Sequence, residues 1–138
     1  MVFPKKINAA AVLLLILAGF LFTASGAHAS ESGSKEGGGL YARLEPFTVN
    51  LLGLSQYLQV AITLKLAKPE VEEAIKANMP IIRHEVILLL SSKEASQISS
   101  FDGKQKLMEE TKQAINKVLK HTEKDGVANT LFESFIIQ

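Results

Sequence analysis

Residues 57–66 read Tyr-Leu-Gln-Val-Ala-Ile-Thr-Leu-Lys-Leu, the clearest strand in the chain. Apolar side chains recur at every second position: Leu58, Val60, Ile62, Leu64 and Leu66. A two-residue period is typical of a β-strand with one buried face. The sequence therefore predicts a ten-residue strand that buries these five side chains on the same side of a sheet.

A second strand is predicted just before this one. Residues 47–51 (Phe-Thr-Val-Asn-Leu) alternate apolar and polar side chains, and Pro46 precedes them, where a strand tolerates a missing N–H. Only a short connector, residues 53–56, separates the two strands. Because a short connector favours antiparallel pairing, we expect the two strands to form a β-hairpin.

Helical periodicity follows. Pro69 is expected at the first position of a helix, with three glutamates in the first turn, where they face the positive helix end. The apolar period continues to Leu89, but Pro80 interrupts it. Because proline lacks the N–H that a helix interior needs, we predict a kink or a short break near Met79.

The last third of the chain predicts a second helix and a final strand. Ser91 with Glu94 and Asp102 with Gln105 match capping boxes, the second one starting a helix over residues 103–120. Gly126 closes the turn that follows, and residues 127–137 form the last strand. The expected fold class is α+β, in the order β-β-α-α-β, with an antiparallel three-stranded sheet packed by helices on one face.

The N-terminus differs in kind from the rest. Of the first 29 residues 20 are apolar, and Ala9–Phe22 carries no charge after Lys5 and Lys6. The Ala-His-Ala of residues 27–29 fits a secretory signal peptide cleaved between Ala29 and Ser30. Residues 7–27 are also long enough for a single transmembrane anchor. Both alternatives stay open, and both place the rest of the chain on the exported side.

Composition separates a linker from a domain. Residues 30–39 read SESGSKEGGG, which predicts a flexible linker, and residues 40–138 form the domain. The whole chain has 15 Lys+Arg against 14 Asp+Glu; without Lys5 and Lys6 the balance is 13 against 14. This near-neutral balance argues against nucleic-acid binding. The chain has no cysteine, which excludes disulfides, thiolate metal sites and a cysteine nucleophile.

Few residues point to chemistry. His84 and His121 lie far apart in the sequence, and neither belongs to a metal-binding pattern. No G-x-S-x-G motif occurs, and no positioned base accompanies the serines of residues 91–100. We therefore expect no catalytic residue, no cofactor and no metal. The predicted class is an exported binding or scaffold module; a small periplasmic enzyme would need His84 and His121 to cluster in a pocket.

Five patterns occur in order along residues 41–138, although each alone is weak: residues 46–51, 57–60, 82–93, 103–116 and 131–138. Single positions within them stand out: Pro46, Phe47, Asn50, Arg83, Gly103, Asn116, Phe132, Phe135 and Gln138. Together these patterns resemble the FliL family of flagellar basal-body-associated proteins. Two features depart from the family: a shorter start and apolar run than usual, and His84 where the family often has Asp.

The resemblance implies a function as well as a fold. It implies a single-pass bacterial inner-membrane protein at the flagellar basal body, with a stomatin/SPFH-like periplasmic domain that self-associates into a ring. The implied partners are stator proteins of the MotA–MotB type, and the implied role is to support motor rotation, motility and chemotaxis. The alternatives are a soluble periplasmic variant after cleavage, and a general periplasmic scaffold without a motor role.

Under this resemblance several residues receive expected roles. Phe47 is expected in the core, and Pro46 and Asn50 are expected to shape a strand edge. Arg83 is a long donor that either bridges a neighbouring subunit, forms an ion pair within the domain or faces solvent. Because Phe132 and Phe135 are an odd number of positions apart on a strand, they are expected on opposite faces, one in the core and one in contact with a partner.

Overall fold

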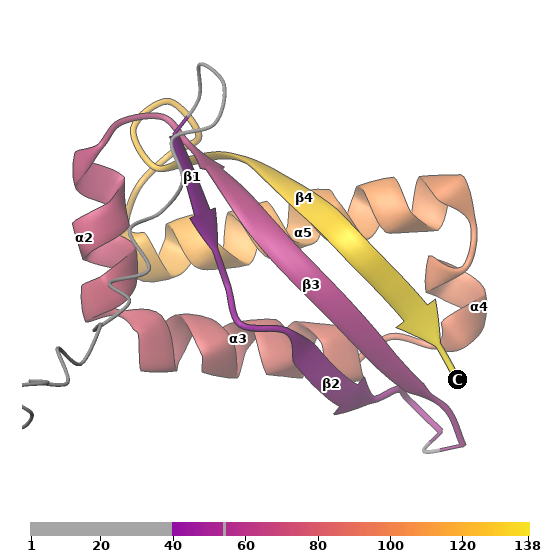
Figure 1. Ribbon diagram of the computed structural model, residues 1–138. Coiled ribbons are helices and arrows are strands. Elements are labelled where there is room, and N and C mark those ends of the chain that lie inside the picture. Colours follow the sequence, from indigo (N-terminus) through magenta and orange to yellow (C-terminus); the bar gives the residue numbers. More distant parts are fainter. Residues whose placement is uncertain (1–39, 54) are drawn as a thin grey trace, which may run out of the picture. The chain divides into compact units, whose positions relative to one another are not determined.

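The structure is a computed structural model that describes residues 40–53 and 55–138 (Figure 1). The signal or anchor predicted for residues 1–29 and the linker predicted for residues 30–39 lie outside the described residues. The described elements, in chain order, are β1 (Leu40–Arg43), β2 (Phe47–Asn50), β3 (Tyr57–Leu66), α2 (Glu70–Ala77), α3 (Met79–Ser91), α4 (Ala95–Ile98), α5 (Phe101–Leu119) and β4 (Val127–Ile137).

Strand β3 forms the centre of an antiparallel sheet. Its residue Val60 pairs with Phe47 of β2 on one edge and with Phe135 of β4 on the other. The pairing of β2 with β3 confirms the predicted hairpin. The predicted sheet of three strands was wrong, because β1 adds a fourth strand beside the far half of β3, where Leu40 lies opposite Leu66. Its four residues are too few to show a period next to a glycine-rich stretch.

The helices all cover the same face of the sheet (Figure 1). On that face, the five alternating apolar residues of β3 are at most 5% exposed, as the sequence predicted. They join one core cluster with buried side chains of α3 and α5, including Ile82, Val86, Leu107 and Ile115. Each fully buried aliphatic side chain of this kind contributes about 1.5–3 kcal/mol. The one-sided burial of β3 is therefore what attaches the helical layer to the sheet.

The break predicted near Met79 is confirmed. Helix α2 ends at Ala77 and α3 begins at Met79, so that Pro80 falls in the first turn of α3, where its missing N–H is not needed. The intervening Asn78 donates from its side-chain Nδ2 to the carbonyl oxygen of Ala74 at 2.8 Å. The side chain thus satisfies one carbonyl near the end of α2.

Both predicted capping boxes were wrong. Ser91 is the last residue of α3, and the capping box forms instead between Glu94 and Gln97 at the start of α4. Helix α5 begins at Phe101, two residues earlier than predicted, because the Ser100 hydroxyl accepts the Gly103 N–H at 3.0 Å. Several residues in this segment can cap a helix, and the path of the backbone before each helix decides which one does so.

Gly103 marks the point where α4 and α5 meet. A Cβ at this position would collide with the backbone carbonyl of Gln97 and would lie within 3.1 Å of the Ser100 hydroxyl. A backbone atom cannot move aside as the end of a flexible side chain can. Gly103 therefore permits the tight turn between α4 and α5 rather than breaking a helix.

We predict that Gly103→Ala lowers the free energy of unfolding by about 1–3 kcal/mol, the usual effect of overpacking. The direction of the change is informative, because helix propensity alone would make the alanine variant more stable by about 1 kcal/mol. Urea unfolding followed by circular dichroism measures the change, and Gln113→Ala on the exposed side of α5 is the control. A stabilised Gly103→Ala variant would contradict the close approach.

Candidate interaction surface

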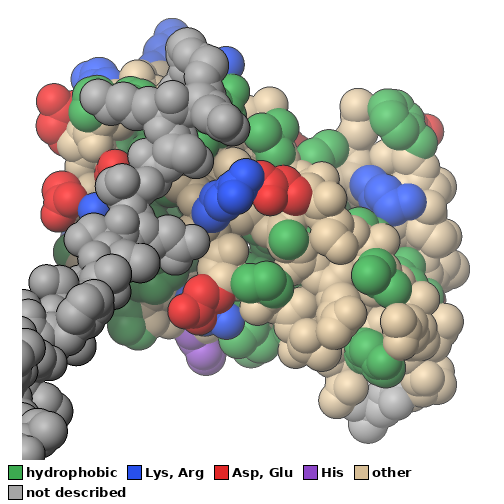
Figure 2. Space-filling view, in the orientation of Figure 1, with side chains coloured by type: hydrophobic (Ala, Val, Ile, Leu, Met, Phe, Trp, Pro, Cys, Tyr) green, Lys and Arg blue, Asp and Glu red, His purple; other side chains and the backbone are tan. Residues whose placement is uncertain are grey.

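Among residues 40–53 and 55–138, no helix lies on the second face of the sheet (Figure 1), the face that Figure 2 shows. Cross-strand partners share a face, so the register places Tyr41 beside Lys65, and Leu131 beside Thr63. Large apolar side chains on this face remain exposed: Tyr41 (43%), Tyr57 (38%), Leu131 (37%) and Ile136 (43%). Exposed apolar groups on an uncovered sheet are typical of an interaction surface. We call this the open face.

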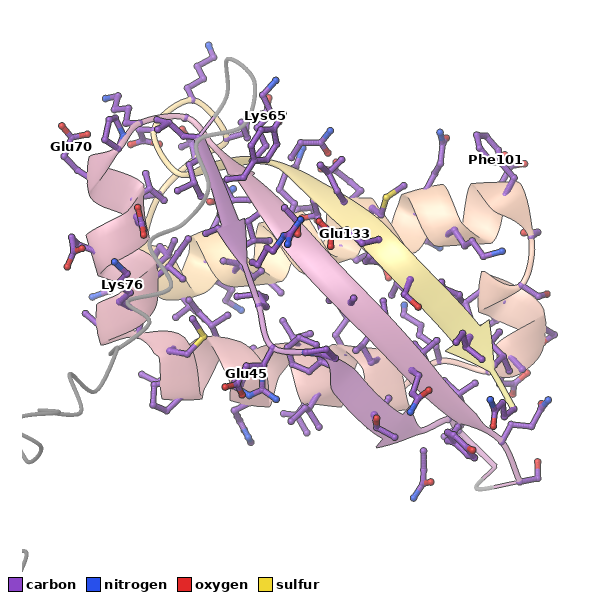
Figure 3. All side chains as sticks on the ribbon, viewed as in Figure 1. Glu45, Lys65, Glu70, Lys76, Phe101 and Glu133 are labelled. Carbon is purple, nitrogen blue, oxygen red and sulfur yellow. The ribbon has the colours of Figure 1, made fainter. Side chains whose placement is uncertain are left out.

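A charged pair lies within the open face. The Glu133 carboxylate accepts a hydrogen bond from the Thr63 hydroxyl at 2.7 Å and lies 3.4 Å from Nε of Arg43. Figure 3 shows Glu133 in the middle of the sheet. The Arg43 side chain is 75% exposed, so this ion pair contributes little to stability. The pair therefore offers one carboxylate and one guanidinium to a partner that approaches the open face.

The orientation predicted for Phe132 and Phe135 was wrong. Both rings lie on the helix side of the sheet, stacked with their centroids 5.4 Å apart. The cause is a β-bulge: the register passes from Ala61 opposite Ser134 to Ile62 opposite Phe132, which leaves Glu133 as an extra residue. Because this extra residue lies between them, the two rings point to the same face of the sheet. Both are half-buried against the core, so neither ring lies on the open face.

Arg83 is held within the domain. Its Nη1 donates to the carbonyl oxygen of Glu45 at 3.1 Å, and its guanidinium carbon lies 4.6 Å from the centre of the Phe47 ring. The Glu45 carboxylate is 3.8 Å from the same nitrogen. The ion pair within the domain, one of the three expected roles, is present. Arg83 thereby fastens the connector between β1 and β2 to α3, with Phe47 buried and Pro46 exposed beside it.

Asn116 connects α5 to the start of β4. Its Nδ2 donates to the carbonyl oxygen of Val127 at 2.9 Å, and its Oδ1 accepts the Val127 N–H at 2.8 Å. A Cβ on Gly126 would collide with that same Oδ1. From the sequence, Asn116 stood out as a motif position without an assigned role, and Gly126 was predicted to close a turn. Their joint role depends on two segments meeting in space, which no local pattern shows.

Asn50 and Gln138 lie on either side of Tyr57 at the far end of the sheet. Gln138 exchanges both backbone hydrogen bonds with Tyr57, at 2.8 and 3.0 Å, and its Oε1 accepts from the Tyr57 hydroxyl at 2.6 Å. Asn50 pairs with Tyr57 on the opposite edge and borders a shallow groove between β2 and α3. Leu52 and Ile87 also line this groove and are 57% and 39% exposed.

Lys112 forms a second charged cluster near the end of α5. Its ammonium lies 2.8 Å from Glu109 and 2.9 Å from Glu123, and its side chain is 11% exposed. The hydrogen bonds that Lys112 donates, to Glu109 first and then to Glu123, raise its pKa. The hydrogen bond from Lys112 likewise lowers the pKa of Glu109 below its usual 4.5. The cluster joins α5 to the loop before β4 and is structural.

The two histidines lie on different elements. His84 is exposed on α3, and His121 follows α5 with its Nδ1 3.9 Å from the Asp125 carboxylate. Within residues 40–53 and 55–138, no three His, Asp or Glu side chains gather where they could hold a metal ion. Among the helices of the same residues, none combines the length and apolar content that a bilayer crossing requires.

These features define a small α+β domain whose distinctive polar residues hold the fold together and whose open face is left for contacts. Comparison with known proteins gives the family. The model of the family described as flagellar basal body-associated protein FliL matches residues 41–138. The chain therefore belongs to the FliL family.

Two relatives illustrate the match. A flagellar protein FliL from Aquifex aeolicus (strain VF5) is 33% identical over 105 residues, which cover 75% of this chain and 63% of the relative. A flagellar protein FliL from Escherichia coli (strain K12) is 28% identical over 100 residues, 72% of this chain and 65% of the relative. The chain thus spans less than two thirds of the length of the curated relatives it matches.

We predict that Asn116→Ala lowers the free energy of unfolding by about 2–4 kcal/mol. The substitution leaves the buried N–H and carbonyl of Val127 without their partner, and each such group costs about 1–3 kcal/mol. Urea unfolding measures the loss. Asn116→Asp keeps only the side-chain acceptor, so its free energy of unfolding should lie between those of the parent chain and the alanine variant. Equal stability of all three chains would refute this role for Asn116.

A second prediction from this site concerns how the stability of the domain depends on pH. Because the pKa of Glu109 is lowered in the fold, its contribution is present above its usual 4.5 and is lost as pH falls through the lower folded value. The Glu109→Gln variant should therefore be less stable than the parent chain near neutral pH and should converge with it as the solution becomes strongly acidic. Thermal unfolding across that range tests this, with Glu85→Gln on the exposed side of α3 as the control. A constant difference at every pH would contradict it.

Proposed function

We propose that this chain is a non-catalytic flagellar basal-body protein. It associates with a stator complex of the MotA–MotB type and supports motor rotation, motility and chemotaxis as a periplasmic oligomeric scaffold. The family match over the whole described domain carries this proposal. The open face supports it, because a scaffold acts through contacts and this face presents apolar groups around an exposed ion pair.

The free edge of the sheet supports self-association. Strand β4 runs over 11 residues, and among the described strands it pairs with β3 alone. Its outer edge therefore presents backbone groups to which another strand can add. When one copy contributes this edge and the next contributes a different surface, head-to-tail contacts close into a ring if the rotation allows it.

The location that we propose is the inner membrane at the basal body. Residues 7–27 serve as the anchor, residues 30–39 serve as a flexible linker, and the domain of residues 40–138 lies in the periplasm. Cleavage between Ala29 and Ser30 would instead release a soluble periplasmic protein. The intact mass of the protein isolated from membranes distinguishes the two.

We predict that charge on the open face abolishes the function while the fold persists. Leu131 and Ile136 are both partly exposed on this face, so the double variant Leu131→Glu/Ile136→Glu should fold and yet fail to bind the stator. In a strain that lacks the protein, it should restore neither swimming nor swarming, and it should not co-purify with stator proteins. Phe101→Glu is the matched control, because Phe101 is 73% exposed on α5, outside the sheet.

Three outcomes separate the alternatives. Full motility of the double variant would refute a role for the open face. Normal swimming and swarming in the strain that lacks the protein would count against the motor role. Co-purification with non-flagellar membrane proteins, without the stator, would favour a general periplasmic scaffold.

A further inference from the structure

We propose that the end of the domain at which the chain enters binds the headgroups of anionic phospholipids. This basic end consists of residues 65–70 and 117–125 with the start of β1. The inference rests on the proposed membrane location, which it extends from an anchor to a docked domain.

Three segments converge at the basic end. Leu40, the first described residue, pairs with Leu66 at the end of β3. The loop after β3 joins the loop before β4, because the Ala67 N–H donates to the Gly126 carbonyl at 2.9 Å. Figure 1 shows both loops beside the start of β1. Whatever precedes residue 40 therefore attaches to the domain here.

The basic end is rich in exposed lysines. It carries five exposed lysine side chains against three acidic residues: Lys65, Lys68, Lys117, Lys120 and Lys124, with Glu70, Glu123 and Asp125. Over residues 40–138 the chain has 12 Lys+Arg and 12 Asp+Glu, so the excess positive charge of this end is balanced by negative charge elsewhere on the domain. The domain is neutral as a whole and electrically polarised.

Two of the three acids are already engaged within the fold. The Glu123 carboxylate pairs with Lys112 at 2.9 Å. The Asp125 carboxylate accepts both the N–H and the hydroxyl of Thr122 at 2.6 Å. In contrast, the salt bridges of the described residues include none of the five lysines of the basic end. With Glu123 paired to Lys112, five lysines remain against the two carboxylates of Glu70 and Asp125, so positive charge dominates the field that this end presents.

A lipid surface suits this arrangement better than a soluble anion does. The lysines are spread over the end of β3, the last turn of α5 and the two loops, so they suit an extended anionic surface better than a compact soluble anion. Tyr41 lies opposite Lys65 and is 43% exposed, and tyrosine favours the water–membrane interface. A linker of the composition predicted for residues 30–39 would span about 15–20 Å, so an anchor at residues 7–27 would keep the basic end close to the bilayer.

The absence of cysteine makes a direct test possible. Two single-cysteine variants of the full chain carry a fluorophore: Asn129→Cys, directly opposite Lys65 of the basic end, and Gln56→Cys in the β2–β3 turn at the far end. Each is reconstituted in vesicles of phosphatidylcholine, with or without phosphatidylglycerol, that contain a quencher on the lipid headgroup. We expect quenching at position 129 only with phosphatidylglycerol, its loss in high salt, and little quenching at position 56.

Matched substitutions assign the effect to the basic end. Lys68→Gln/Lys124→Gln should lower the ratio of docked to undocked domain about fivefold per lysine. Lys104→Gln/Lys106→Gln removes the same charge from the other half of α5 and should leave the ratio unchanged. Equal quenching in both lipid mixtures, or equal effects of the two double variants, would overturn the proposal.

Flotation of the same samples separates this inference from the proposed location. A chain that floats with both vesicles but shows no lysine-dependent quenching keeps its anchor and refutes docking. A chain that floats with anionic vesicles alone, in a lysine-dependent way, supports docking and refutes the anchor. A chain that floats with neither refutes both.

Discussion

The occupation of both edges of β3 is the constraint on which the rest of the domain depends. Antiparallel pairing with β2 and β1 on one side and with β4 on the other fixes which side chains of all four strands face the helices. A shift of one residue in any ladder would turn a buried row outward. Because Leu58, Val60 and Ile62 are almost completely buried, that shift is strongly disfavoured, and the helices can pack on only one face of the sheet.

The bulge at Glu133 is the single departure from this regularity that creates a surface feature. Without the extra residue, Phe132 and Phe135 would lie on opposite faces, and one ring would occupy the open face. With it, both rings pack on the core side, and the carboxylate of Glu133 reaches Thr63 and Arg43 instead. Because of the bulge, the open face presents an ion pair where it would otherwise present an aromatic ring.

Local periodicity predicted the parts of the fold that local sequence determines: β3, the hairpin, the break at Asn78 and the last strand. It failed where a contact between distant segments decides. Strand β1 has no pattern of its own, the bulge leaves the apolar spacing of β4 ambiguous, and Gly103 and Gly126 are required by neighbours that approach them. The candidate site was not predictable from the sequence, because none of the positions singled out there is an exposed apolar residue or a member of the ion pair of the open face. Arg83 and Asn116 instead hold the fold together through Glu45 and Val127, which lie on other segments.

The open face and the basic end meet at β1, and this has a geometric consequence. Tyr41 belongs to both, since its side chain lies on the open face while its strand begins at the end where the chain enters. Nine steps of about 3.3 Å separate Tyr57 from Leu66 along β3, so the far end of the strand lies about 30 Å from the basic end. Docking of the basic end on a bilayer would therefore hold the far end of the open face away from the headgroups. The Arg43–Glu133 pair, between the two ends, would then face a neighbour in the membrane plane rather than the lipid.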